Sequence, residues 1–534
     1  MDTTSLHLSL KAPKSHSHKE EQRSKMRECV PFKPGTIYGS NSSPLSTVPS
    51  EASSQQYAFD HVIANDEEAS VQTKSEETLP AGFQNYTSIT FIKYAYSLAI
   101  LAFSVTVVTA TIFTNQTKIA ADVHSIVAFI LLWVLTLWLA IMEGGQGCLV
   151  GLQPIDKTLY AQSHPKALKV TTLAHKEENL ERFIIGRQFL VVLVIFGINM
   201  CGSALKGARV LNLPDILVEI FINSGVALIL MTTILGQLTA QVNAADCMLD
   251  FINNYGMLIT THVSLFIEMS GLLHSVYLVQ IAFAKITGKS TESNQSTRTI
   301  PQAIFFWLRI VFSVAVLSFS LAVTLVALFD GKTTMYSGVP EPVSVTLLFV
   351  LMAFVGMMEG MQIALFAVIN MPKDELKKHS QAAKVCDLVF SGSHLQAFLI
   401  GRQICVTCCM FIVARVATCN VDEGETTIFG VSAGIQNFFN TGLLGAIITT
   451  IIGSLAWRII ASAFPVAFLS NPLIYLIIRL CLFLESSGVC SAAWVLARLQ
   501  KKVAGYKPDV DYLGPSKTGG AGKKLEDDLE LQEN

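Results

Sequence analysis

The stretches IMEGGQGCLV (residues 141–150) and MMEGMQIALF (residues 357–366) carry the same polar motif inside two apolar segments. Each contains Glu-Gly-x-Gln, and the second copy follows the first by 216 residues. A Gly-Arg-Gln motif follows each of them, at Gly186 and again at Gly401. Carboxylates, guanidinium groups and amides are costly in hydrocarbon. Their repetition therefore predicts a polar site at the interface of two repeats, an arrangement typical of membrane transporters.

The composition of the chain is that of an integral membrane protein. Of its 534 residues, 51% are hydrophobic and 15% are charged, and the mean hydropathy is +0.49. Soluble domains carry about 25% charged residues. A net charge of −2 gives no indication of a nucleic-acid partner. The sequence shows no nucleophile elbow, phosphate-binding glycine loop or zinc-protease helix, so we expect a protein of the lipid bilayer that is not an enzyme and needs no cofactor.

Ten apolar runs follow a polar beginning. Each has roughly 20 or more residues, enough to cross a bilayer as a helix. We expect the spans near 89–113, 124–150, 183–206, 215–240, 255–286, 302–330, 343–370, 395–418, 431–457 and 462–486. The polar segments at the two ends, 1–86 and 501–534, are predicted to be cytoplasmic tails, the first of them disordered.

The repeat extends well beyond the two motifs. Asn223-Ser224-Gly225 matches Asn440-Thr441-Gly442 in the fourth predicted helices. Residues 87–290 and 300–500 therefore form two repeats of five predicted helices each. An odd number of spans ends on the opposite side of the membrane from its start, so the second copy must be inverted. The expected fold class is an all-α polytopic membrane protein of ten transmembrane helices, arranged as two inverted five-helix repeats, which is the usual frame for alternating access.

The lysine-rich loops leave the orientation in the membrane open. In a ten-span arrangement the loop that contains Lys169 would face the cytoplasm, and the equally basic loop that contains Lys384 would face outward. One loop then satisfies the positive-inside rule and the other violates it.

Two interpretations fit the polar motifs. Glutamine offers two donors and an acceptor on one planar group, which suits a neutral, hydroxyl-rich solute. Alternatively, the Glu and Arg side chains form buried ion pairs that lock the second and third helices of each repeat together. Within each Glu-Gly-x-Gln motif the polar residues are three apart and share a helix face. The candidate substrate-binding residues are Glu143, Gln146, Arg187, Gln188, Glu359, Gln362, Arg402 and Gln403.

A second set of polar side chains recurs in the fourth predicted helices. The oxygen atoms of Asn223, Ser224, Asn440 and Thr441 suit a hard cation such as sodium. Small polar residues also simply let membrane helices pack closely, so both interpretations stay open.

Other ionisable residues in the apolar runs give weaker signals. Glu268 and Glu485 are either carboxylates of a coupling site or side chains that reach toward the membrane surface. Cys405, Cys408 and Cys409 have a spacing similar to that of metal sites but lack a second ligand cluster, so no metal other than sodium is expected.

At these motifs the chain resembles the diatom silicon transporters, a ten-helix family with paired EGxQ and GRQ motifs. Both motifs occur twice here, in register, and the resemblance covers roughly residues 87–500. Cys247-Met248-Leu249-Asp250 is similar to the CMLD segment of members from pennate diatoms. The resemblance implies silicic acid as the substrate, sodium as the coupling ion and the GxQ motifs as the substrate site. It implies a symporter that carries silicic acid into the cell, in the plasma membrane or in an intracellular vesicle membrane.

Two other functions remain open from the sequence. A passive channel for small neutral solutes needs a continuous pore, and duplicated Asn-Pro-Ala half-helices are absent from the sequence. A transporter that couples another small solute to cations or protons would use the same fold. The oligomeric state is not indicated.

Overall fold

The computed structural model describes residues 88–205, 207–287, 300–335, 338–369, 371, 376–392, 394–421 and 424–513. All of these residues fall in one compact unit, Val48–Asn534. The predicted tail 1–86 lies outside the described residues. Within them the secondary structure is helical and contains no β-strand, only two isolated bridges, Thr117 with Ala204 and Thr333 with Cys419. The predicted all-α class is confirmed for this part of the chain.

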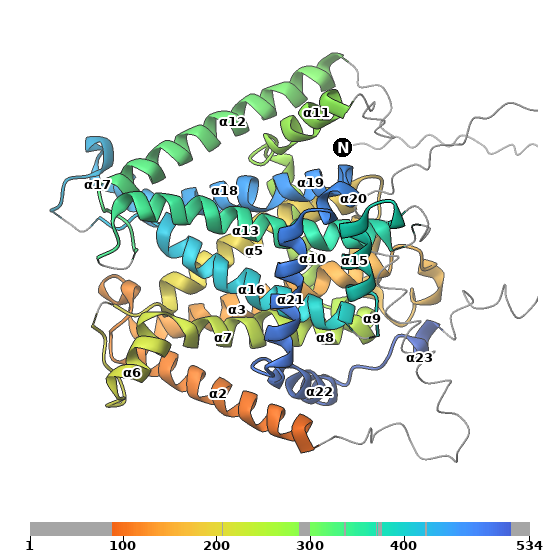
Figure 1. The fold of residues 1–534 in the computed structure, drawn as a ribbon, viewed down its shortest axis with the longest axis horizontal. Coiled ribbons are helices and arrows are strands. Elements are labelled where there is room, and N and C mark those ends of the chain that lie inside the picture. Colours follow the sequence, from red (N-terminus) through yellow and green to blue (C-terminus); the bar gives the residue numbers. More distant parts are fainter. Residues whose placement is uncertain are drawn as a thin grey trace, which may run out of the picture. The chain divides into compact units, whose positions relative to one another are not determined.

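Eight helices in the described ranges are long and apolar enough to cross a membrane, which supports a multi-pass membrane protein (Figure 1). Four lie in each half of the sequence. Those of the first half are α2 (Ser88–Phe113), α3 (Ser125–Gly151), α5 (Asn179–Gly202) and the continuous helix Val226–Asp246, made of α7 (Val226–Thr233), the π-helical turn η4 (Ile234–Leu238) and α8 (Thr239–Asp246). Those of the second half are α12 (Ile300–Phe329), α13 (Glu341–Val368), α16 (His394–Ala417) and Leu443–Ala463, made of α18 (Leu443–Thr450), the π-helical turn η6 (Ile451–Leu455) and α19 (Ala456–Ala463).

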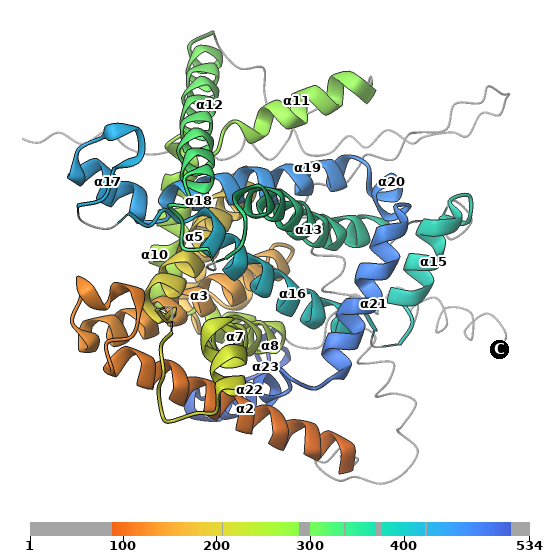
Figure 2. The ribbon, with the colours of Figure 1, turned by 60° about the vertical axis from the view of Figure 1, so that its left-hand side comes forward.

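Shorter elements follow the same order in both halves, so the predicted internal repeat is visible in the structure (Figures 1 and 2). The first half contains α4 (Pro165–Ala174), α6 (Asp215–Leu217) with η3 (Val218–Asn223), α9 (Met248–Ile252), α10 (Tyr255–Met269) and α11 (Val276–Thr287). Their counterparts are α15 (Ser380–Val389), α17 (Ala433–Asn440), α20 (Pro465–Leu469), α21 (Pro472–Ser486) and α22 (Ala492–Ala504). Three 3₁₀ turns, η1 (Lys118–Ala121), η2 (Lys157–Leu159) and η5 (Ile428–Gly430), and α23 (Val510–Leu513) complete the described part.

The fourth and fifth predicted spans differ from the prediction. The fourth helices begin only after Gly225 and Gly442, which adopt left-handed φ values of 83° and 76°. The fifth segments are interrupted, because Gly271 and Gly488, with φ values of 87° and 74°, end α10 and α21 after 15 residues each. A helix of that length covers about 22 Å, less than the roughly 30 Å of a hydrocarbon core. The prediction of continuous helices over 255–286 and 462–486 is therefore wrong.

The ten-span inverted arrangement is not confirmed. With four spans in each half, the second half starts on the same side of the membrane as the first. Figure 1 shows the two leading helices, α2 and α12, running in the same direction, while α21 crosses the direction of α13 and α16. The inversion was inferred from an odd number of spans, and the shortness of the fifth segment removes that basis. The eight spans favour two parallel repeats, the other common arrangement in transporters.

The two halves exchange their last helices. Helix α11 of the first half contacts α19 of the second, and α22 of the second half contacts α8 and α2 of the first (Figure 2). The matched serines of α2 and α12 hold the exchange in place. Ser97 Oγ donates to the carbonyl oxygen of Val489 at 2.6 Å, and Ser313 Oγ donates to that of Leu272 at 2.6 Å.

The segment after α22 binds the Cys247–Asp250 motif. The Asp509 carboxylate accepts hydrogen bonds from the backbone amides of Met248 and Leu249, at 2.7 and 3.0 Å. Asp250 in turn contacts His164 Nε2 at 3.0 Å and accepts the Lys507 amide at 2.8 Å. Burial raises the pKa of the Asp509 carboxyl to about 6 although the two amides lower it. The motif therefore fixes the first 13 residues of the predicted C-terminal tail, 501–513, to the first half.

Candidate functional site

In the first half, the Glu-Gly-x-Gln and Gly-Arg-Gln motifs meet a third helix. Glu143 of α3 lies 3.5 Å from Arg187 Nη1 of α5, and it accepts a hydrogen bond from Gln241 Nε2 of α8 at 3.1 Å. Arg187 is 2% exposed, and its Nη2 donates to Gln188 Oε1 at 3.1 Å. Three helices of the half are therefore joined by one buried polar contact.

In the second half the corresponding residues form a tighter set. Glu359 of α13 accepts from Arg402 Nη1 of α16 at 3.2 Å and from Arg458 Nη2 of α19 at 2.7 Å. Arg402 Nη2 also donates to Gln403 Oε1 at 3.0 Å, as in the first half. Arg458 takes the place of Gln241, which it follows by 217 residues. The sequence analysis missed both residues, although a single Arg inside the apolar run 443–463 is a signal that could have found it.

The two sets lie close together where the halves meet. Helix α5 contacts α16, and Arg187 interacts electrostatically with Glu359 and Arg458 of the other half. Thr407 of α16 donates a hydrogen bond to Gln237 of the π-helical turn η4. Such turns occur frequently at functional sites, because they redirect the side chains that follow. We call the joined set the central cluster, which consists of Glu143, Arg187, Gln241, Glu359, Arg402 and Arg458.

The glutamines of the motifs fall into two groups. Gln188 and Gln403 are 3% exposed, and each accepts from the arginine that precedes it, so they hold the guanidinium groups in place. Gln146 and Gln362 lie one helical turn beyond the glutamates on α3 and α13 and are only half-buried. They are the candidates with side chains less enclosed by the protein.

The glycines of the motifs are required by close packing. A Cβ atom on Gly186 would overlap the carbonyl oxygen of Ser264 in α10, and one on Gly401 would overlap that of Cys481 in α21. The Gly-Arg-Gln motif therefore lets the short fifth helix touch the backbone of α5 or α16, and this contact positions the neighbouring arginine.

Two donors of the central cluster have no acceptor. The Nε atoms of Arg187 and Arg402 are buried, and no hydrogen-bond acceptor for them is present among the described residues. A buried donor left without a partner costs about 1–3 kcal/mol or more. The same donor is open in both halves, which indicates a place for a ligand rather than a local irregularity.

The candidate sodium ligands lie away from this cluster. Asn223 and Ser224 precede α7, about 23 Å of helix from Gln241 at 1.5 Å per residue. The carbonyl oxygen of Asn223 accepts from Arg415 Nη1 at 2.7 Å. In the second half, the Asn440 amide donates to Val421 and accepts from Gln436, both at 3.0 Å. The structure therefore does not bring the two sets together.

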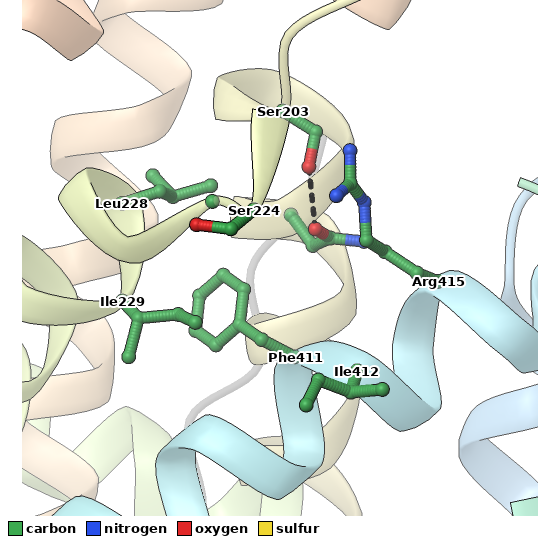
Figure 3. A pocket seen from close by; sticks show the side chains of 9 residues that line it. Ser203, Ser224, Leu228, Ile229, Phe411, Ile412 and Arg415 are labelled. Atoms are coloured by element: carbon green, nitrogen blue, oxygen red, sulfur yellow. Dashed lines mark hydrogen bonds between the residues drawn. The ribbon is translucent and has the colours of Figure 1, made fainter. Parts of the chain in front are cut away.

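A recess lies beside the first of these sets. Its empty volume is about 230 Å³, part of it open solvent. Ser203, Ser224 and Arg415 line its polar side, and Phe411 and Leu228 its apolar side (Figure 3). Ser203 donates to Asn199 at 2.6 Å.

Glu268 is an ion-pair centre. Buried to 3% exposure, it accepts from Arg182 Nε at 2.7 Å and lies 3.7 Å from Arg309 Nη2 of the other half. His274 approaches it at 3.6 Å. Glu268 thus holds the start of α5 and the leading helix α12 to the end of α10, and the interpretation as a side chain at the membrane surface does not apply to it.

The thiols of the Cys405–Cys409 stretch are free, as are the other cysteines within the described ranges. Those ranges contain no group of three His, Cys, Asp or Glu side chains that could hold a metal ion.

Eight apolar helices around a buried charged cluster define a multi-pass membrane protein with a polar centre between two repeats. A family model described as Silicon transporter matches residues 85–534, and the chain belongs to that family. The family supports transport of silicic acid and a role outside catalysis. Neither a curated protein nor a solved structure matches the chain.

Proposed function

We propose that the chain is a sodium-coupled symporter that carries silicic acid into the cell by alternating access between its two halves. The observation that carries this proposal is the central cluster, in which both copies of the family motifs meet at the interface of the halves with one open donor each. The substrate site proposed is that of the sequence motifs, extended by Gln241 and Arg458.

The chemistry of the cluster fits the substrate. Silicic acid carries four hydroxyl groups, each of which donates and accepts hydrogen bonds. The amides of Gln146 and Gln362 supply donors and acceptors, and the Nε atoms of Arg187 and Arg402 supply donors. A solute that is neutral in solution gains nothing directly from the membrane potential, so its accumulation requires a coupled ion, for which we propose sodium.

Purified protein in liposomes tests the function. We expect silicic acid to accumulate when a sodium gradient points inward and not to accumulate without one. Equilibration without accumulation would instead support a passive channel. Accumulation driven by a proton gradient alone, or no silicic acid uptake at all, would support a transporter of another kind.

The half-buried glutamines are expected to bind substrate. Gln146→Ala and Gln362→Ala should each lower the rate of silicic acid uptake at least tenfold while leaving the amount of folded protein near normal, because each removes hydroxyl-binding groups without stranding a charge. Gln153→Ala, at an exposed position just beyond α3, is the matched control. Normal uptake by both single variants would exclude these residues from the substrate site.

The sodium candidates are expected to act unequally. Arg415 places a positive charge beside Asn223, which repels a cation there, so the second set is the stronger candidate. Asn440→Ala should raise the sodium concentration for half-maximal uptake more than Asn223→Ala does, at saturating silicic acid. An unchanged sodium dependence in both variants would remove both sets from the coupling site.

The eight-span arrangement predicts the sides of the loops. It places α4, with Lys169, and α15, with Lys384, on the same side of the membrane as the two termini, so both basic loops satisfy the positive-inside rule. Cysteines introduced at these two exposed positions should therefore resist an impermeant thiol reagent in intact cells and react after permeabilisation. Asp122→Cys, in the exposed α2–α3 loop, should react in intact cells. Reaction of the Lys384 position alone would restore the inverted arrangement.

A further inference from the structure

The charges of the central cluster do not balance. Within the described part of the chain it holds three guanidinium groups, of Arg187, Arg402 and Arg458, and two carboxylates, of Glu143 and Glu359. Three positive charges against two negative ones leave one positive charge. All five side chains are at most 9% exposed. A net charge buried to this degree is costly unless an opposite charge joins it.

The imbalance comes from one difference between the repeats. Glu143 faces one guanidinium and one neutral amide, that of Gln241. Glu359 divides its single negative charge between two guanidinium groups, at 3.2 and 2.7 Å. The first repeat thus provides, within the same molecule, a neutral version of the charged set in the second.

The open donors show where an additional negative charge would bind. The Nε–H groups of Arg187 and Arg402 are buried without an acceptor in the described part of the chain. Hydrogen bonds from guanidinium to an ionised oxygen are roughly twice as strong as those between neutral groups. An oxyanion would therefore satisfy both donors and balance the cluster, whereas a neutral hydroxyl satisfies the donors only.

We propose that the central cluster binds silicic acid as its conjugate base, the singly charged silicate anion. This inference rests on the proposed function. The ligand enters as the neutral acid that prevails at neutral pH. On binding, the O–H bond of one hydroxyl breaks, the oxygen keeps the electron pair, and the proton leaves to the solvent. The three remaining hydroxyls keep their protons and bind to the amides of the motifs. An opposite charge within about 4–6 Å shifts the ionisation of an acid by about 1–3 pH units, in the direction required here.

Proton release upon binding tests this inference. Silicic acid is titrated calorimetrically into the purified full-length protein at saturating sodium, in two buffers of equal pH with different ionisation enthalpies. The difference in heat counts the protons, and we expect about one released for each silicic acid bound. By linkage, the apparent dissociation constant should then fall about tenfold for each pH unit between pH 6 and 8.

Two variants at one position provide the controls. Arg458→Gln rebuilds in the second repeat the Glu–Arg–Gln set with which the first repeat already folds, and it should bind silicic acid with almost no proton release and little pH dependence. Arg458→Lys keeps the charge and should retain the release. If Arg458→Gln does not bind, the pH dependence of the wild-type protein and the lysine variant still decide the question.

The outcomes separate this inference from the proposed function. Binding of silicic acid by the wild-type protein with equal heat in both buffers would overturn the anionic form and leave the transport function intact. Absence of any binding, together with absence of uptake in liposomes, would overturn the function and this inference with it.

Discussion

Replacing Glu359 by Gln is expected to destabilise the protein by roughly 3–5 kcal/mol, the cost of leaving buried charge without its partner. Glu359 is 5% exposed and accepts from the guanidinium groups of both Arg402 and Arg458. Glutamine retains the shape and one acceptor but removes the negative charge. Two guanidinium groups from two different helices would then face each other without compensation. The thermal unfolding of the variant in detergent, compared with that of the wild-type protein, measures the effect.

Glu143→Gln is the matched control for this prediction. Glu143 lies 3.5 Å from one guanidinium, and its second oxygen accepts from a neutral amide, so the same substitution removes less stabilisation. We expect less than half the loss in unfolding temperature seen for Glu359→Gln. Equal losses for the two variants would contradict the asymmetry on which the inference about the bound anion depends.

Gly186→Ala and Gly401→Ala are expected to be nearly as damaging. In each case the new Cβ would overlap a backbone carbonyl of the fifth helix, an atom that cannot move without shifting α10 or α21 as a whole. Overpacking in a close-packed interior costs about 1–3 kcal/mol, and more when no flexible side chain can yield. The yield of monodisperse protein after solubilisation, together with its unfolding temperature, should fall for both variants.

Gly147→Ala tests whether this effect is specific. Gly147 lies within the same helix and next to the first motif, but a Cβ there would meet no atom within 4 Å. Alanine also has a higher helix propensity than glycine, so this variant should be as stable as the wild-type protein or slightly more stable. A loss similar to that of Gly186→Ala would mean that α3 and α5 do not tolerate any change near the motifs, and the proposed helix contact would lose its support.

The sequence predicted the repeat and the residues of the motifs well, because both are visible as matched letters at a fixed spacing. The contact of Glu359 with Arg402 follows from two motifs on adjacent helices, and the structure confirms that contact. Arg458 and Gln241 were missed because they differ between the repeats, so a search for matched residues passes over the pair that carries the asymmetry.

The number of spans could not be predicted from hydropathy alone. The apolar run 255–286 is long enough to cross a membrane, but hydropathy does not register that Gly271 adopts a positive φ and ends the helix. Likewise, the glycine of the Gly-Arg-Gln motif makes a close contact that holds a short helix across α5 instead of parallel to it. One misjudged element in each half changed an even number of spans to an odd one and thereby reversed the predicted orientation of the second repeat.

The exchange of α11 and α22 has a consequence for what counts as a domain here. Each half completes its surface with the final helix of the other, which is the arrangement of a domain-swapped dimer whose two partners have been joined into a single chain. Cutting the connection between α11 and α12 would leave two polypeptides that still hold each other by their ends. A half produced alone would lack the helix that covers its α8 or α19, and its natural partner would be a second copy of itself.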